Sequence, residues 1–264
     1  MSKYKEEKQN IWLSENDVIN IITNLDTKSK TRINYTFSQI TVDFDLQDIM
    51  EYKGFYLAKN ILRSELGFEK DKKPGDFDII IIPYKEDKIF FERTIVCEVK
   101  IVRPTRRKPS KNANSLGITQ INGLIEDGFP LISLIHIIMT EPLLEEEKME
   151  IKYCTIPANR ENGEKIDFDN LDKFLVDVKE DHFGWFATDN QMRRLITSEL
   201  PKYIAIQCFS LEFDIKNNIS MSFPSQNLRS FENGYFNPKL KEETIQKIRK
   251  HFYDHPNRYE NQKK

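Results

Sequence analysis

Apolar residues cluster in short runs along the middle of the chain. The densest runs lie at 77–82, 89–102 and 132–140, and each is followed within two residues by a proline. Runs of this length, rich in isoleucine and valine, are typical of strands that are covered on both faces. The pattern favours an α/β protein with a buried central sheet.

Other segments repeat apolar residues at the helical period. The segments 14–25, 45–66, 114–126 and 238–252 do so, and we expect a helix in each. Ser14 and the acids after it form an N-cap signal for the first helix. In the helix expected over 45–66, Gly67 is placed to end the helix. The apolar residues that recur there at helical spacing are Ile49, Met50, Ala58, Ile61, Leu62 and Leu66.

The remaining segments predict further strands and helices. We expect strands at 36–44 and 149–156, a short helix at 171–178, and a helix at 189–200 capped by Thr188 and ended by Pro201. A hairpin is expected from 203–213 to 219–223. The chain divides into an N-terminal helical or extended segment (1–44), a core (45–142) and a C-terminal α+β elaboration packed on that core (143–264).

The overall charge excludes a generally basic surface. The 264 residues include 40 Lys and Arg and 42 Asp and Glu, for a formal net charge of -2, so any nucleic-acid-binding surface must be local. Three scattered cysteines suggest neither a zinc site nor a disulfide framework. The longest apolar run, 129–139, is interrupted by His136 and too short for a bilayer. We therefore expect a cytoplasmic protein without membrane contact.

Charged residues interrupt two of the apolar runs at regular positions. Asp76 and Asp78 open the first run after Pro74-Gly75, and Glu98 and Lys100 lie within the next. Because side chains alternate across a strand, each pair shares a face. Charges among isoleucine and valine are unfavourable unless they are paired or bind a metal. If the two strands pair, three carboxylates and an ammonium meet at one sheet edge.

A basic loop follows the lysine strand directly. It contains Arg103, Arg106, Arg107, Lys108 and Lys111. A solvated charge run is one interpretation, and contact with phosphate groups is the other, which the position after Lys100 favours. His136 in the following strand is expected to be a core histidine.

Carboxylates and a lysine in this arrangement suit phosphodiester hydrolysis. Mg²⁺ prefers oxygen ligands, accepts few from protein and keeps several waters. A neighbouring lysine can orient a metal-bound water and balance the charge that develops on phosphorus. Together they fit in-line attack of water on a phosphodiester.

The run Pro74-Gly75-Asp76-Phe77-Asp78, the apolar strand and then Glu98-Val99-Lys100 resemble the motif of the PD-(D/E)xK nuclease superfamily. The resemblance covers roughly residues 45–140. It implies an α/β, restriction-endonuclease-like αβββαβ core with a central mixed sheet flanked by helices, and Mg²⁺-dependent cleavage of nucleic acid, with Mn²⁺ as a possible substitute.

The resemblance also implies roles for individual residues. Asp78 and Glu98 would be metal ligands and Lys100 the catalytic lysine. Gln120 would match a glutamine that follows the lysine strand in exonuclease-like branches. Asp76 would be a further ligand or an ion-pair partner, and Glu51 would fill the place of a helix carboxylate, although its alternative is a first-turn acid favoured by the helix dipole.

The sequence leaves two other functions open. The same fold could be a catalytically silent nuclease-like module for nucleic-acid binding or assembly, or the charged residues could form a structural ion-pair cluster. For the nuclease we expect DNA rather than RNA as substrate, a possible homodimer or partner protein, and a role in restriction, defence or mobile-element biology by analogy alone.

Overall fold

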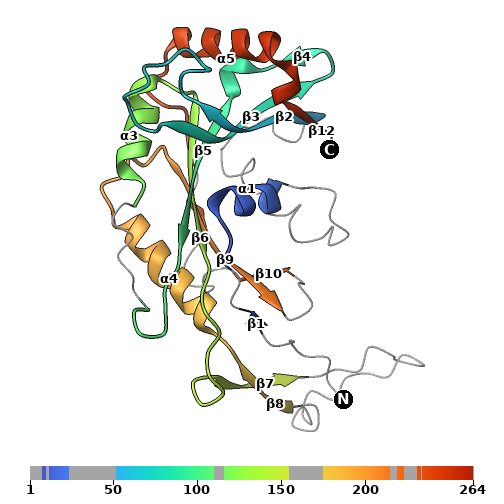
Figure 1. Cartoon of the computed structure of the whole chain (residues 1–264), viewed down its shortest axis with the longest axis vertical. Coiled ribbons are helices and arrows are strands. Elements are labelled where there is room, and N and C mark those ends of the chain that lie inside the picture. Colours follow the sequence, from blue (N-terminus) through green and yellow to red (C-terminus); the bar gives the residue numbers. More distant parts are fainter. Residues whose placement is uncertain are drawn as a thin grey trace, which may run out of the picture.

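The structure is a computed structural model, and it describes residues 8–9, 12–23, 52–109, 116–154, 175–214, 219–222, 231–232 and 234–263. Four α-helices lie in this part: α1 (Glu15–Thr23), α3 (Ile118–Asp127), α4 (Phe183–Ile196) and α5 (Glu242–Asp254). The strands that carry the argument are β2 (Gly54–Leu62), β3 (Asp76–Lys85), β5 (Ile95–Val102), β6 (Leu131–Ile138) and β9 (Ala205–Asp214). Figure 1 gives their arrangement.

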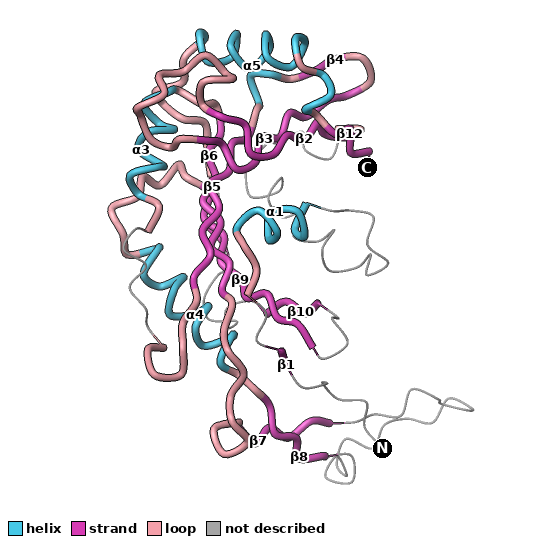
Figure 2. The backbone as a smooth tube through the Cα atoms, viewed as in Figure 1, coloured by secondary structure: helices cyan, strands magenta, loops and turns pink. Residues whose placement is uncertain are grey.

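Shorter elements complete the fold. They are β1 (Lys8–Gln9), β4 (Lys88–Ile89), β7 (Met149–Cys154), β8 (Leu175–Glu180), β10 (Ile219–Ser222), β11 (Phe231–Glu232), β12 (Glu260–Lys263) and two 3₁₀ turns, Phe91–Arg93 and Pro256–Arg258. Strands β7 and β8 pair only with each other and project at one end of the molecule (Figure 2).

One mixed sheet organises the described residues. Its main path runs β1-β9-β6-β5-β3-β2-β12, with β10 and β11 beside β9 and β4 beside β3. The central strands β5, β6 and β9 are parallel to one another, whereas β3 pairs antiparallel with β5, and β2 pairs antiparallel with β3. Residues after 143 therefore supply strands to both sides of the sheet: β9 lies beside β6, and β12 pairs with β2.

A hydrophobic core covers each face of the sheet. On one face lie buried residues of α3, α4 and α5, with Ile80, Ile82 and Val96 beneath them. On the other face α1 packs its Val18, Ile19 and Ile22 against β3 and β5. Because both faces are covered, β3 and β6 are apolar almost throughout. The expected α/β layers with a central mixed sheet are confirmed.

The helix expected over 45–66 is wrong where the structure describes it. Residues Gly54–Leu62 form strand β2, paired antiparallel with β3 on one side and β12 on the other. A strand buried on both faces has apolar residues at nearly every position, and such a run can imitate helical spacing. The neighbouring strand that stabilises β2 on this side is distant in sequence, because Tyr56 of β2 pairs with Asn261 of β12.

Two further expectations fail in the C-terminal half. The segment expected as a helix from 171 includes strand β8, which is held by pairing with β7. Helix α4 begins at Phe183, so Thr188 is internal, and its hydroxyl donates to the Gly184 carbonyl instead of capping. The strand expected at 36–44 lies outside the described residues.

Several local signals are confirmed. Ser14 and Asp17 cap α1 reciprocally, because the Asp17 amide donates to Ser14 Oγ and the Ser14 amide donates to the Asp17 carboxylate. The hairpin of β9 and β10, the strand β7 and the closing helix α5 also occur where their patterns predict them.

Candidate functional site

The candidate site lies where strands β3 and β5 stop pairing. Their antiparallel register runs Ile81 with Ile95, Ile80 with Val96 and Ile79 with Cys97. One step further along this register, Asp78 lies opposite Glu98. There the Asp78 Oδ2 atom accepts a hydrogen bond from the Val99 backbone N–H at 2.6 Å. A carboxylate thus satisfies a backbone donor at the point where the two strands part.

Glu98 and Lys100 form the second half of the site. They are two residues apart on β5, and Lys100 Nζ lies 2.6 Å from Glu98 Oε1. Asp78 and Glu98 are 4% and 3% exposed, whereas the Lys100 side chain is 20% exposed. The structure therefore brings Asp78, Glu98 and Lys100 together, as the sequence predicts.

Burial and nearby charges shift the pKa values of the two carboxyl groups. Burial, the proximity of Glu98 and further charge effects raise the pKa of Asp78 to about 8. Burial raises the pKa of Glu98 as well, although Lys100 opposes the shift. Both groups would ionise more readily if another positive charge stood between them.

Lys100 stays charged in this setting. Burial works to lower its pKa, but the attraction of Glu98, the hydrogen bond to it and the nearby acids outweigh burial, so the pKa of Lys100 is raised. At neutral pH the site therefore presents an ammonium group, which can donate a proton or balance negative charge but cannot accept a proton.

A fourth carboxylate reaches the site from α1. Glu15, the first residue of α1, interacts electrostatically with Asp78, Glu98 and Lys100. In the sequence Glu15 is recognisable only as part of an N-cap signal, and the helix carboxylate is expected at Glu51, which lies outside the described residues. The available signal was an acid at the start of a short amphipathic helix, which by itself indicates only the helix dipole.

Asp76 and Gln120 lie at the margins of this arrangement. Asp76 is exposed at the start of β3, and its charge contributes to the raised pKa of Glu98. Gln120 lies in the first turn of α3, shortly after Gly117, which has φ 72° and sits against Leu134 and the Lys100 side chain. The Gln120 Oε1 atom is buried and accepts no hydrogen bond within the described structure.

The basic loop after β5 divides into paired and unpaired cations. Arg103 donates to the Leu13 carbonyl, and its guanidinium lies 4.5 Å from the centre of the Trp12 ring. Arg106 forms ion pairs with Glu141 at 3.4 Å and Glu147 at 3.3 Å.

The other two described cations of the loop are free of such pairs. Arg107 and Lys108 are exposed, and within the described ranges neither forms an ion pair. Lys111 lies outside those ranges. The cations most available for a phosphate are therefore Arg107 and Lys108.

His136 is a core histidine, as expected. It is fully buried on β6 beside Lys100 in the strand register, and burial lowers its pKa to about 3. The Gln191 side-chain amide donates to His136 Nδ1 at 2.9 Å, so the neutral ring carries its proton on Nε2. A neutral histidine adds no charge to the site.

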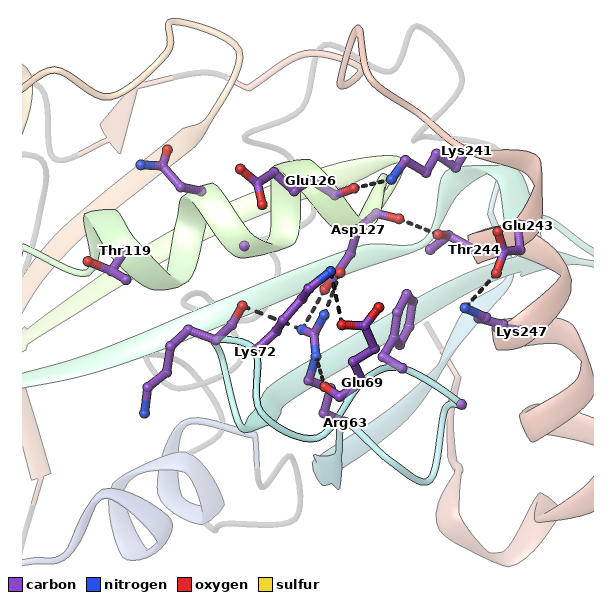
Figure 3. Close-up of a pocket in the computed structure, with 15 residues that line it drawn as sticks. Arg63, Glu69, Lys72, Thr119, Glu126, Asp127, Lys241, Glu243, Thr244 and Lys247 are labelled. Atoms are coloured by element: carbon purple, nitrogen blue, oxygen red, sulfur yellow. Dashed lines mark hydrogen bonds and ion pairs between the residues drawn. The ribbon is translucent and has the colours of Figure 1, made fainter.

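A surface cavity of about 850 Å³ is lined by residues of the 63–73 segment, of α3 and of the start of α5, and none of the predicted site residues lines it (Figure 3). Its lining includes a buried ion pair between Arg63 and Asp127. The Arg63 guanidinium donates two hydrogen bonds to the Asp127 carboxylate, from Nη1 to Oδ2 at 2.6 Å and from Nη2 to Oδ1 at 2.5 Å. Further bonds of Arg63 to the Glu69 and Lys73 carbonyls fasten the 64–75 loop to the end of α3. Most of the other lysines that line the cavity are also paired: Lys72 with Glu69, Lys247 with Glu243, and Lys241 with the Glu126 carbonyl. These pairs indicate that the charged residues of the cavity have a structural role.

The donor set suits a small hard cation with few protein ligands. Asp78 and Glu98 supply carboxylate oxygens, and Mg²⁺ commonly takes one or two carboxylates and completes its shell with water. Across the described ranges, no group of three or more His, Cys, Asp or Glu side chains is close enough to hold a metal ion. The fit to Mg²⁺ thus rests on the Asp78–Glu98 pair, with Glu15 and Asp76 further out.

Comparison of the chain with models of known protein families, with curated proteins and with solved structures finds no match. Among the helices that the structure describes, none has both the length and the apolar character to cross a bilayer.

Proposed function

We propose that this chain is a metal-dependent nuclease that hydrolyses phosphodiester bonds, with DNA as the substrate. The observation that carries the proposal is the position of Asp78 opposite Glu98 where β3 and β5 part, with Lys100 beside Glu98 at 2.6 Å. Two neighbouring buried carboxyl groups with raised pKa values are a common sign of a functional site.

The order of elements supports a restriction-endonuclease-like core. Among the described elements, α1, β2, β3, β5, α3 and β6 follow one another, which is an αβββαβ order if the two-residue strand β4 is counted with the turn before β5. Strands β5 and β6 are parallel across the α3 connection. In this proposal α1 takes the place of the first helix.

Asp78 and Glu98 would hold Mg²⁺ or Mn²⁺. The bound ion would supply charge neutralisation and a more acidic water. The chain's own contribution begins with Asp78, whose orientation is fixed by the Val99 N–H. Lys100, held charged by Glu98, would stabilise negative charge on the phosphate oxygens. Arg107 and Lys108 would position the phosphate backbone without reading its sequence.

The decisive experiment is incubation of the purified full chain with labelled duplex DNA, single-stranded DNA and RNA in Mg²⁺, Mn²⁺ or EDTA. We expect cleavage that requires the metal and that Asp78→Ala and Lys100→Ala each abolish. Lys59→Ala is the matched control, because Lys59 is also a partly buried strand lysine paired with a glutamate, Glu260, at 3.1 Å. Metal-independent cleavage, or full activity of Lys100→Ala, would refute the proposal.

One observation favours a second candidate, a catalytically silent module that binds nucleic acid or a partner. Lys100 already neutralises Glu98 through a direct ion pair, so the site can be satisfied without a metal. This candidate predicts binding of nucleic acid in the same assay without cleavage in either metal.

A further inference from the structure

An exposed tryptophan lies close to the candidate site. Trp12 is 78% exposed, although burial of so large an apolar side chain would stabilise the fold. It precedes Glu15 by three residues, and Glu15 interacts electrostatically with Asp78, Glu98 and Lys100. Trp12 therefore belongs to the same segment that brings Glu15 to these charged groups.

The tryptophan is held in place by a residue that follows the lysine strand. Arg103, three residues after Lys100, donates a hydrogen bond from its guanidinium to the carbonyl of Leu13. The same guanidinium lies 4.5 Å from the Trp12 ring centre, in cation–π contact. One basic side chain thus fixes both the backbone next to Trp12 and the ring itself, so the exposed ring is positioned and not a loose surface residue.

Exposed positive charge follows Arg103 closely along the chain. Arg103 leads directly into the turn closed by Thr105 and Lys108, which carries the exposed cations Arg107 and Lys108. An exposed aromatic ring next to cations beside a phosphate-cleaving site is the arrangement that binds unpaired nucleotides, because a ring stacks on any base while the cations contact the backbone. A base inside a duplex is already stacked on both sides and offers no free face.

We propose that Trp12 is a stacking platform for an unpaired nucleobase next to the scissile phosphate. The inference rests on the proposed nuclease function and extends it: the substrate is a single strand, or a duplex whose end or junction releases an unpaired base at this point. Arg103 acts as a positioning residue for the platform.

Fluorescence provides a direct test, because the chain has two tryptophans, Trp12 and Trp185. The full chain with Trp185→Phe reports on Trp12 alone. In EDTA, we expect a single-stranded thymidine oligonucleotide to quench its emission to saturation. An abasic oligonucleotide of the same length, which keeps the phosphates, and a blunt duplex should leave the emission nearly unchanged.

Affinity measured by fluorescence anisotropy gives the second readout. Loss of one base–aromatic stack weakens binding of the single strand about ten-fold in Trp12→Ala, and Trp12→Phe should keep most of the affinity. Tyr253→Ala is the matched control, because Tyr253 is an aromatic residue of α5 with 62% exposure. Unchanged melting temperatures would show that the variants are folded.

The outcomes separate this inference from the nuclease proposal. Saturated binding without quenching, or equal quenching by the abasic strand, would overturn the stacking platform even if the protein cleaves DNA. Quenching by the single strand without cleavage in Mg²⁺ or Mn²⁺ would support the platform and overturn the nuclease.

Discussion

The Asp78 carboxylate accepts a hydrogen bond from the Val99 backbone amide at 2.6 Å, across the point where β3 and β5 separate. The bond fixes the carboxyl group opposite Glu98 in a buried position. In that position the carboxyl group ionises less readily, because burial and the charge of Glu98 raise its pKa to about 8. In the proposed nuclease, stability, metal binding and catalysis would therefore depend on the same few charged groups.

Replacing Asp78 by asparagine should stabilise the metal-free protein. The unfolded chain ionises Asp78 near its ordinary pKa of 3.8, whereas the folded chain does so only near 8. The folded state therefore binds the extra proton between these values, and its stability falls as pH rises through this window. An asparagine side chain cannot ionise, and its amide oxygen can still accept the Val99 bond.

We expect the melting temperature of Asp78→Asn to exceed that of the natural chain by about 2–4 °C near pH 8, with little difference near pH 4. Asp76→Asn is the control, because Asp76 is exposed. A marked loss of stability in Asp78→Asn would instead favour a structural ion-pair cluster.

Mg²⁺ should stabilise the folded chain more strongly as pH rises. Binding of the metal requires ionised carboxylates, so it must displace the proton that Asp78 holds up to about pH 8. Thermal melts with excess Mg²⁺ should show an increasing shift from about pH 6 to about pH 8. The shift should vanish in the double variant Asp78→Asn, Glu98→Gln, and a shift retained there would place the metal elsewhere.

Glu15→Gln should move the pH dependence of the Mg²⁺ effect. The negative charge of Glu15 contributes to the raised pKa values of Asp78 and Glu98. Its removal lowers both, so the pH midpoint of the Mg²⁺-induced melting shift should fall. Glu242→Gln is the matched control, because Glu242 is likewise the first residue of a helix, α5. Equal midpoints for the two variants would exclude Glu15 from the site.

Lys100→Met should separate catalysis from binding. The ammonium group is expected to act on developing charge, and loss of such a group typically lowers the rate by about 10²–10⁴-fold. Single-turnover cleavage measures the rate, and anisotropy in EDTA measures affinity for DNA, which should change little. A loss confined to affinity would assign Lys100 to binding alone.

Breaking the Arg63–Asp127 pair should destabilise the fold without a direct effect on the site. Both side chains are largely buried, at 2% and 9% exposure, and removal of one partner leaves an unpaired buried charge. We expect Arg63→Ala to lower the free energy of unfolding in urea by about 3–5 kcal/mol. The exposed pair Lys250–Asp254 is the control, and Lys250→Ala should leave the free energy of unfolding nearly unchanged, because solvent screens exposed ion pairs.

Strands β3, β5 and β6, and the charged residues that interrupt the first two, are encoded locally in the amino-acid sequence. Charges in an apolar strand are conspicuous because burial makes them unfavourable, and the alternation of side chains assigns Glu98 and Lys100 to one face. The capped start of α1 is equally local, because Ser14 and Asp17 satisfy each other within one turn.

The tertiary fold alone determines which distant residues join them. Strand β2 depends on hydrogen bonds to β3 and β12, so its own spacing of apolar residues could not distinguish a strand from a helix. Glu15 and Trp12 reach the site because α1 packs its apolar face on β5 and Arg103 holds the preceding backbone. Such contacts join residues about ninety positions apart, and nothing in the local pattern of the chain encodes them.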